Sequence, residues 1–364
     1  MKKVRSFGIG LLVLLWVALT GFAWFGPKQD ISDAERRPLA QMPEISAEAV
    51  LDGEWMTKFE KYTLDQFPLR DRFRQIKSLT HYYVFGQRDN NAIYIADGHA
   101  AQMEYPLDEA SVDHALKQFQ KVYDRYLKQS GSKIYTTVVP DKGYYLAEEN
   151  GYLALDYEKM FSQVQAGMPW AQYVDITDCL GIGNYYYTDT HWRQEDILLV
   201  AKKLSQAMGV TYPKAGDFTQ TLLERPFYGV YYGQAALPMQ AEPMYILESQ
   251  LLEQCTVFNY TTGQTGAVYD MEKLYSKDQY EVFLSGSQSL LRIDNPNGIA
   301  DKKLIVFRDS FGSSLVPLLV QDYAQVTLVD IRYISVDVLS QYVDFQNADV
   351  LFMHSTLVLN KNLI

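Results

Sequence analysis

The sequence has few cysteines and no excess of positive charge. Its 364 residues include two cysteines, Cys179 and Cys255, and 33 Lys and Arg against 44 Asp and Glu, a net charge of −11. Two cysteines are too few for a disulfide framework or a four-cysteine metal site, although they could form one bridge in an oxidising compartment. A nucleic-acid binder would show a basic face, so the acidic balance argues against nucleic acid as a partner.

Charge is also missing from one long stretch near the N-terminus, and no second stretch of this length occurs. Residues 7–25 run for 19 positions without a charged side chain, after the basic residues of 1–6. This length suffices for a transmembrane helix and exceeds the usual apolar segment of a cleaved signal peptide, which is the alternative. Because the basic residues precede it, the N-terminus is expected in the cytoplasm and the rest outside the cell membrane. We therefore predict a basic flank at 1–6, a signal anchor at 7–25, a linker at 26–46 and an extracytoplasmic domain at 47–364.

The hydrophobic pattern of the long domain predicts an α/β fold. Residues 108–130 have the spacing of an amphipathic helix, and a glycine then leads into 133–139, which is typical of a buried strand. Further strands are expected at 82–85, 92–95, 172–176, 303–307, 325–329 and 350–352. Further helices are expected on both sides of Pro68 and at 157–165 and 194–208. This alternation indicates helices packed around a sheet. Between about 211 and 300 the pattern becomes aromatic and strand-like, which predicts a β-rich insertion.

A first chemical motif runs from Tyr187 to Trp192 and reads Tyr-Thr-Asp-Thr-His-Trp. A carboxylate two positions from a histidine on a turn can hydrogen-bond the imidazole, so Asp189 would fix the tautomer of His191. His191 would then serve as a general base. The alternative is a helix cap with an incidental histidine. No metal site is expected, since no second His or Cys lies at ligand spacing.

A second motif places Ser310 where an apolar strand ends and a helix begins, in Arg-Asp-Ser-Phe-Gly. Open α/β sheets bind ligands at this edge, and nearby backbone amides can stabilise an oxyanion. Ser310 is therefore a candidate nucleophile, with a helix cap as the alternative. Asp189, His191 and Ser310 together supply a Ser-His-Asp triad, whose chain order is not constrained. His354, which follows another apolar stretch, is the competing histidine.

Several side chains near the motifs are candidate substrate contacts. Arg308 could orient a carboxylate or a developing negative charge, and Lys142 follows another strand end. Aromatic side chains that could stack on a sugar, or fill a core instead, are Tyr185, Tyr186, Tyr187, Trp192, Tyr228, Tyr231 and Tyr232. We predict Arg308, Lys142, Tyr187, Trp192 and Tyr232 as the substrate-binding set.

The two motifs, with Pro140-Asp141-Lys142, resemble the SGNH-hydrolase-like domains of the alginate O-acetyltransferase type. The chain is still more similar to the DHHW-type proteins of Gram-positive bacteria, with Thr190 where a His gives that family its name. The resemblance spans about residues 31–364. It implies a three-layer α/β/α domain in which the Asp-x-His element precedes the Ser element, a permuted order. No cofactor is expected.

The resemblance also implies a function. Such proteins work outside the cytoplasmic membrane beside a membrane-bound O-acyltransferase that supplies acetyl groups, and they acetylate an exopolysaccharide or wall glycan. Ser310 would accept the acetyl group with His191 as base and pass it to a sugar hydroxyl. The residues that complete the oxyanion hole are not identifiable, with Gly233 and Asn360 as candidates. An acetyl esterase with the same triad and a non-catalytic glycan-binding scaffold remain as alternatives.

Overall fold

The computed structural model describes residues 2–364, with side chains from residue 6 onward, and divides them into two compact units. The first unit extends to Asn91 and includes Tyr232–Pro238, and the second comprises Ala92–Tyr231 and Met239–Ile364. This division differs from the predicted ranges, in which a linker ended at residue 46.

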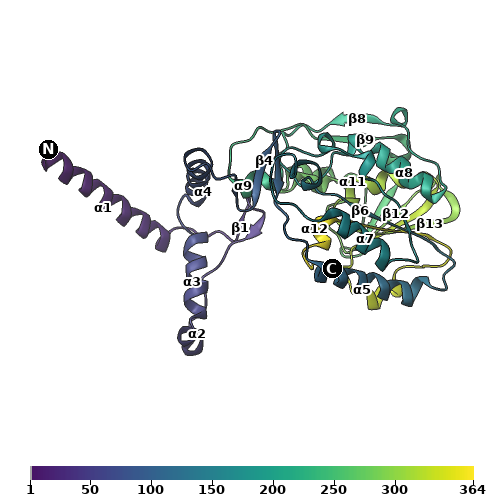
Figure 1. The fold of residues 1–364 in the computed structure, drawn as a ribbon, viewed down its shortest axis with the longest axis horizontal. Helices are drawn as coiled ribbons and strands as arrows, with labels where there is room; N and C mark the ends of the chain where they lie inside the picture. Colours follow the sequence, from purple (N-terminus) through teal and green to yellow (C-terminus); the bar gives the residue numbers. More distant parts are fainter. Residues whose placement is uncertain (1) are drawn as a thin grey trace. The chain divides into compact units, whose positions relative to one another are not determined.

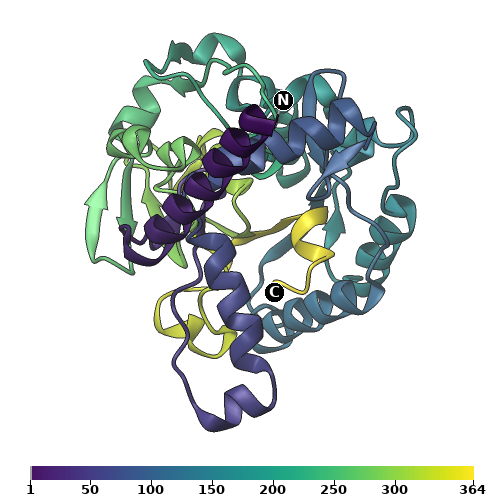
Figure 2. The same ribbon diagram turned by 90° about the vertical axis from the view of Figure 1, so that its left-hand side faces the viewer.

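The first unit is mainly helical. Its helices are α1 (Lys2–Phe25), α2 (Ala47–Leu51), α3 (Glu54–Asp65) and α4 (Arg70–Leu79), shown in purple and blue in Figure 2. Within α1, Ser6–Phe25 is long and apolar enough to cross a membrane. The unit also contains the two-residue strands β1 (Ile31–Ser32), β2 (Arg37–Pro38) and β3 (Asp89–Asn90).

The strand predicted at 82–85 is wrong. Residues Thr80–Val84 form a π-helical turn, η1, that continues α4, and Phe85 N–H donates to the carbonyl of Thr80 at 3.1 Å. The β propensity of Tyr82, Tyr83 and Val84 is overridden because the helix continues through them.

The segment predicted as a linker takes part in the first unit. Arg37 binds the carboxylate of Asp65 with both terminal nitrogens, at 2.8 and 2.7 Å, and Ala40 N–H donates to the same carboxylate at 2.9 Å. The Arg37 hydrogen bonds hold the pKa of Asp65 at about 2. Arg70 pairs with Glu35 through one terminal nitrogen. These contacts attach residues 35–40 to α3 and α4, which is why the compact unit includes them.

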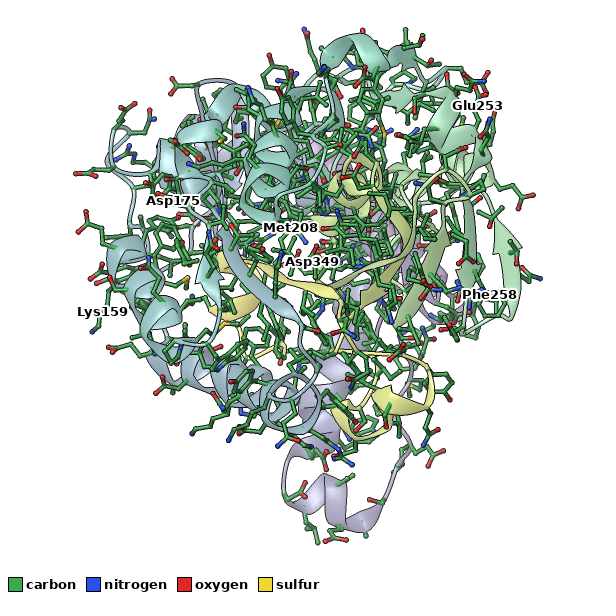
Figure 3. The ribbon with its side chains drawn as sticks, turned by 90° about the vertical axis from the view of Figure 1, so that its right-hand side faces the viewer. Lys159, Asp175, Met208, Glu253, Phe258 and Asp349 are labelled. Atoms are coloured by element: carbon green, nitrogen blue, oxygen red, sulfur yellow. The ribbon has the colours of Figure 1, made fainter. Side chains whose placement is uncertain are left out.

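The second unit is built on an eight-stranded sheet with the order β11-β10-β12-β14-β13-β15-β6-β7. β14, β13, β15, β6 and β7 are parallel, and β11, β10 and β12 add antiparallel pairs beside β14. Figure 3 shows the sheet extending from near Asp175, which follows β7, to Phe258 on β10. The strand bounds are β6 (Lys133–Val139), β7 (Gln172–Tyr173), β10 (Thr256–Asn259), β11 (Gln264–Gly266), β12 (Leu290–Asp294), β13 (Ile299–Arg308), β14 (Tyr323–Val329) and β15 (Asp349–Ser355).

Helices cover both faces of this sheet, because the side chains of its central strands alternate between two cores. On β13, Leu304 and Val306 pack in the cluster that contains α8, and Ile305 and Phe307 pack in the cluster that contains α5 and α7. Figure 1 shows α8 and α11 on one side and α5 and α7 on the other. The bounds are α5 (Glu109–Val122), α6 (Gly143–Leu146), α7 (Tyr157–Gly167), α8 (Leu198–Met208), α11 (Gly312–Leu315) and α12 (Thr356–Leu359). The predicted α/β class with a large central sheet is confirmed.

The region predicted as an insertion contributes in two ways. β8 (Thr219–Leu222) and β9 (Tyr245–Glu248) form a separate antiparallel pair, whereas β10, β11 and β12 extend the central sheet. Its helices are α9 (Val230–Ala235) and α10 (Gln250–Gln254). An antiparallel hairpin, β4 (Ile93–Ala96) with β5 (His99–Gln102), precedes the sheet.

The parallel strands bring several loops to one edge. Arg308 at the end of β13 pairs in register with Met353, and Ser355 at the end of β15 pairs with Val139 at the end of β6. The residues that follow these strands therefore meet at the carboxyl edge of the sheet, where ligands bind in open α/β folds.

Candidate active site

Asp189 and His191 lie at the tip of a short hairpin. Tyr185 pairs with Trp192 in an antiparallel bridge, and Tyr186 N–H donates to the carbonyl of His191 at 3.1 Å. The chain between these positions must turn sharply, which places the two side chains on one side of the turn. The local sequence thus determines the spacing of the carboxylate and the imidazole.

The turn is held from a distant part of the chain by Glu242, a residue outside the predicted site. Its buried carboxylate accepts hydrogen bonds from the N–H groups of Tyr187, at 2.9 Å, and Thr188, at 3.1 Å. Thr188 Oγ1 in turn accepts from Gly229 N–H at 2.8 Å. A lone glutamate 53 positions after Asp189 has no local motif, so only the folded structure reveals this role.

The structure places Asp189, His191 and Ser310 in one hydrogen-bonded series. His191 Nδ1 lies 2.6 Å from Asp189 Oδ2, and His191 Nε2 lies 2.7 Å from Ser310 Oγ. Asp189 is fully buried, and its other oxygen accepts from Val230 N–H at 2.8 Å. Both distances are in the hydrogen-bonding range expected between a nucleophile and its base, and between the base and an orienting carboxylate.

The imidazole is held by an aromatic neighbour. The ring of Tyr280 stacks on His191 with centroids 3.8 Å apart and an interplanar angle of 7°. The Tyr280 hydroxyl lies 2.7 Å from Ser314 Oγ, which also accepts from Trp192 Nε1 at 2.9 Å. Burial raises the pKa of Tyr280 well above its usual value, so this ring stays neutral beside the histidine. The stack restricts rotation of the imidazole and keeps Nε2 directed toward Ser310.

The turn that carries Ser310 is fixed by Asp309, not by Ser310 itself. Asp309 Oδ1 accepts from Phe311 N–H at 3.1 Å, and Oδ2 accepts from Ser355 N–H, at the end of β15, at 2.7 Å. The Gly312 N–H donates to the Asp309 carbonyl, and the Ser313 N–H donates to the Ser310 carbonyl. The three amides after Ser310 are therefore engaged, so a second oxyanion donor beside the Ser310 amide would have to come from another segment.

Two predicted substrate contacts are enclosed by protein. Arg308 is fully buried, and its guanidinium donates to Ser313 Oγ at 3.1 Å and to the Gly286 carbonyl at 3.1 Å. Trp192 is also fully buried against Phe311. In these positions both side chains support the Ser310 turn, and neither presents a surface to a substrate.

The remaining aromatic candidates separate by exposure. Tyr185 and Tyr186 are buried core residues, and Tyr231 is nearly so, whereas Tyr187 and Tyr228 are exposed. Tyr232 and Gly233 belong to the first compact unit, and the triad residues belong to the second. Tyr187 is thus the member of the predicted set that is exposed within the unit of Ser310.

Lys142 is buried beneath the hairpin. Its ammonium donates to the carbonyls of Ala100, at 2.6 Å, and Tyr187, at 3.2 Å, and lies 5.5 Å from the ring centroid of Tyr231. Burial lowers the pKa of Lys142 to about 7, although the nearby carboxylates of Asp189 and Glu242 act in the opposite direction. Lys142 therefore links Ala100 on β5 to the hairpin that carries Asp189 and His191.

The competing candidates have other partners. His354 is buried on β15 and packs against Phe119 with ring centroids 4.7 Å apart, and burial lowers its pKa to about 4. The Asn360 side chain accepts from Asp108 N–H at 2.7 Å and donates to the Pro106 carbonyl at 3.3 Å. Both contacts stabilise the fold. Cys179 and Cys255 are free thiols, so they do not form a bridge.

Solved structures with the same fold are known, although no family model and no curated protein matches the sequence. A DHHW family protein from Eubacterium siraeum is similar over 76% of this chain and 94% of its own, at 19% identity and a TM-score of 0.61. The chain shares its fold with this protein. PatB1 from Bacillus cereus, in a structure with a sulfonyl adduct, is similar over 74% of this chain and 98% of its own, at 15% identity and a TM-score of 0.60. The resemblance to DHHW-type proteins is thus confirmed at the level of the fold.

Lys142→Met is expected to change how stability depends on pH. Between pH 7 and the ordinary lysine pKa of 10.5, the unfolded chain keeps the proton that native Lys142 has released. The unfolded state then binds more protons, so Lys142 makes the wild type more stable as pH rises, by up to about 1.4 kcal/mol per pH unit. The variant lacks this contribution, and urea unfolding of the full chain at pH 7 to 10 measures the difference.

Parallel stability curves for the wild type and Lys142→Met across this range would contradict the lowered pKa. Lys133→Met provides a control, because Lys133 is an exposed lysine at the start of β6. Its curve is expected to follow that of the wild type.

Proposed function

We propose that the chain is an O-acetyltransferase of the SGNH type, in which Ser310 is the nucleophile, His191 the general base and Asp189 the residue that orients and stabilises the imidazole. One observation carries the proposal. Ser310 Oγ, the two ring nitrogens of His191 and Asp189 Oδ2 lie in series at 2.7 and 2.6 Å. Sulfonyl groups form adducts with nucleophilic side chains, so the adduct in the similarly folded PatB1 is in keeping with a nucleophile in this fold.

In the first half-reaction, Ser310 Oγ attacks the carbonyl carbon of an acetyl donor while His191 Nε2 takes the hydroxyl proton. The resulting imidazolium is stabilised by Asp189, whose Oδ2 lies beside His191 Nδ1 and fixes the tautomer of the ring. The tetrahedral intermediate then expels the donor's alcohol or thiol, which leaves with the proton from His191. The enzyme now carries an acetyl ester on Ser310.

The second half-reaction is the reverse with a new partner. A sugar hydroxyl gives its proton to His191 Nε2 and attacks the acetyl carbon, and Ser310 Oγ leaves as it regains that proton. Because the carboxylate and the tyrosine stack hold the imidazole in one orientation, the same nitrogen can serve both steps. The exposed ring of Tyr187, within the hairpin that carries Asp189 and His191, is a suitable surface for a sugar.

The cellular setting follows from α1. An uncleaved α1 would anchor the protein in the cell membrane with its N-terminus in the cytoplasm and the α/β unit outside. There the acceptor would be an exopolysaccharide or wall glycan, and a membrane-bound O-acyltransferase would supply the acetyl group. The hydrolytic alternative, a carbohydrate acetyl esterase, uses the same triad and differs only in using water as acceptor.

The acceptor is therefore the decisive test. The full chain in detergent is incubated with a small activated acetyl ester, with and without oligosaccharides, and the products are separated by mass spectrometry. We expect an acceptor sugar to receive acetyl groups in a His191-dependent manner. If free acetate were the only product, and no tested sugar changed its rate of release, the chain would be an esterase and the transferase proposal would be wrong.

A further inference from the structure

Helix α4 and its continuation η1 carry an apolar stripe on the outside of the first unit. Phe73, Ile76 and Tyr83 are 45, 59 and 69% exposed, and Leu69, Leu79 and Val84 are exposed as well. These positions recur at helical spacing and share one side of the helix. We call this set of six residues the α4 face.

The opposite side of the helix is polar and points inward, which reverses the usual arrangement. Arg70 and Arg74 pair with Glu35, and Arg74 also donates to the Gly233 carbonyl at 3.0 Å. Ser78 is buried and accepts from the side chain of Asn90 at 2.7 Å. Because these contacts fix the rotation of α4, the apolar stripe cannot turn inward without breaking them.

The edges of the α4 face carry positive charge. Arg72 and Lys77 are exposed on its two sides. A helix with an apolar stripe, flanking Arg or Lys and exposed aromatic rings is typical of one that lies in the interfacial plane of a bilayer. The basic side chains then reach the lipid phosphates while the apolar stripe contacts the acyl chains.

The α4 face lies close to the end of the helix that can cross a membrane. Phe22 of α1 and Leu69 and Arg72 of α4 line one cavity of about 340 Å³. Trp24 of α1 lies 6.3 Å from the ring of Phe59 on α3. Since Phe22 lies within the last turn of the apolar helix, an α1 that crosses a membrane would place the start of α4 at the level where α1 leaves the bilayer.

We propose that the α4 face binds the outer surface of the lipid membrane, with Phe73 and Ile76 in the acyl region and Arg72 and Lys77 on anionic headgroups. The proposal rests on α1 acting as an anchor, as proposed above. Membrane contacts through both α1 and the α4 face would hold the first unit against the membrane surface. An anchor through α1 alone, followed by a flexible linker, would let the unit move freely.

Photocrosslinking of the full chain tests this proposal. Benzoylphenylalanine replaces Ile76 in one sample and Asp71, an exposed residue outside the apolar stripe of the same helix, in another. Both chains are reconstituted in vesicles of mixed phosphatidylglycerol and phosphatidylcholine and irradiated. We expect lipid adducts at position 76 at least tenfold more often than at position 71, and fewer in vesicles of phosphatidylcholine alone.

Other outcomes overturn the proposal in identifiable ways. Adducts between position 76 and another protein chain would make the α4 face a protein interface. Equal yields at positions 76 and 71 would show that the anchor alone brings lipid near. Chain that does not remain with the vesicles would refute the anchor itself, and a triad that still transfers acetyl groups in that sample would leave the catalytic proposal intact.

Discussion

Ser310→Ala is expected to lower the rate of acetyl transfer by at least about 10³-fold while the fold is retained. Ser310 Oγ is the atom that would form the acetyl ester, and it is already within 2.7 Å of the base. Without the Ser310 hydroxyl, no nucleophile remains beside His191 Nε2. The measurement is turnover of an activated acetyl ester, together with mass spectrometry of the protein trapped during turnover. We expect an acetylated peptide containing Ser310 in the wild type and none in the variant.

A nearby serine provides the matched control. Ser313 is buried one turn further along and contacts Arg308, but it does not touch His191. Ser313→Ala is therefore expected to keep most of the activity and the acetylated peptide. If Ser310→Ala turned over the ester as fast as Ser313→Ala, the nucleophile would be another residue. A folded wild type that turned over no ester would instead favour the non-catalytic scaffold.

The central strands could be predicted from the sequence because their signal is local. Residues 133–139 are predicted as a strand and form β6 over the same range, since a run of apolar and β-branched residues buried on both faces needs no distant partner to be recognised. The same holds for 303–307 within β13. Residues 82–85 have a similar composition, but there the continuing helix determines the structure, and composition alone could not reveal it.

The candidate site shows the same contrast. Asp189, His191 and Ser310 stand out in the sequence because their residue types and positions at turns are chemically distinctive, and the structure brings them within hydrogen-bonding distance. Glu242 and Tyr280 support the site from positions that no local pattern marks. The motifs predict Arg308 and Trp192 as substrate contacts because a motif does not show that both side chains are buried. A sequence thus indicates reactive groups more readily than the groups that hold them.

Gly229→Ala is expected to lower activity by about 10²-fold without unfolding the protein. A methyl group at position 229 would overlap the backbone nitrogen, Cα and Cβ of Asp189. Either Asp189 must then shift, or residues 229–230 must move away from it. In the wild type the Val230 N–H donates to Asp189 Oδ1 at 2.8 Å, and movement of residues 229–230 away from Asp189 would break that hydrogen bond as well. Displacement of an orienting group by about 1 Å can cost this much in rate. Ester turnover against pH, with unfolding measured in parallel, checks the prediction.

The control is Gly216→Ala, because the same methyl group at position 216 meets no atom within 4 Å. Both substitutions remove the same backbone freedom from the unfolded chain, so their difference reports contact with Asp189 alone. A Gly229→Ala enzyme as active as Gly216→Ala would mean that the position of Asp189 does not limit the rate. Loss of activity in Gly229→Ala with an unfolding midpoint near that of Gly216→Ala would instead place the effect in the geometry of the Asp189–His191 pair.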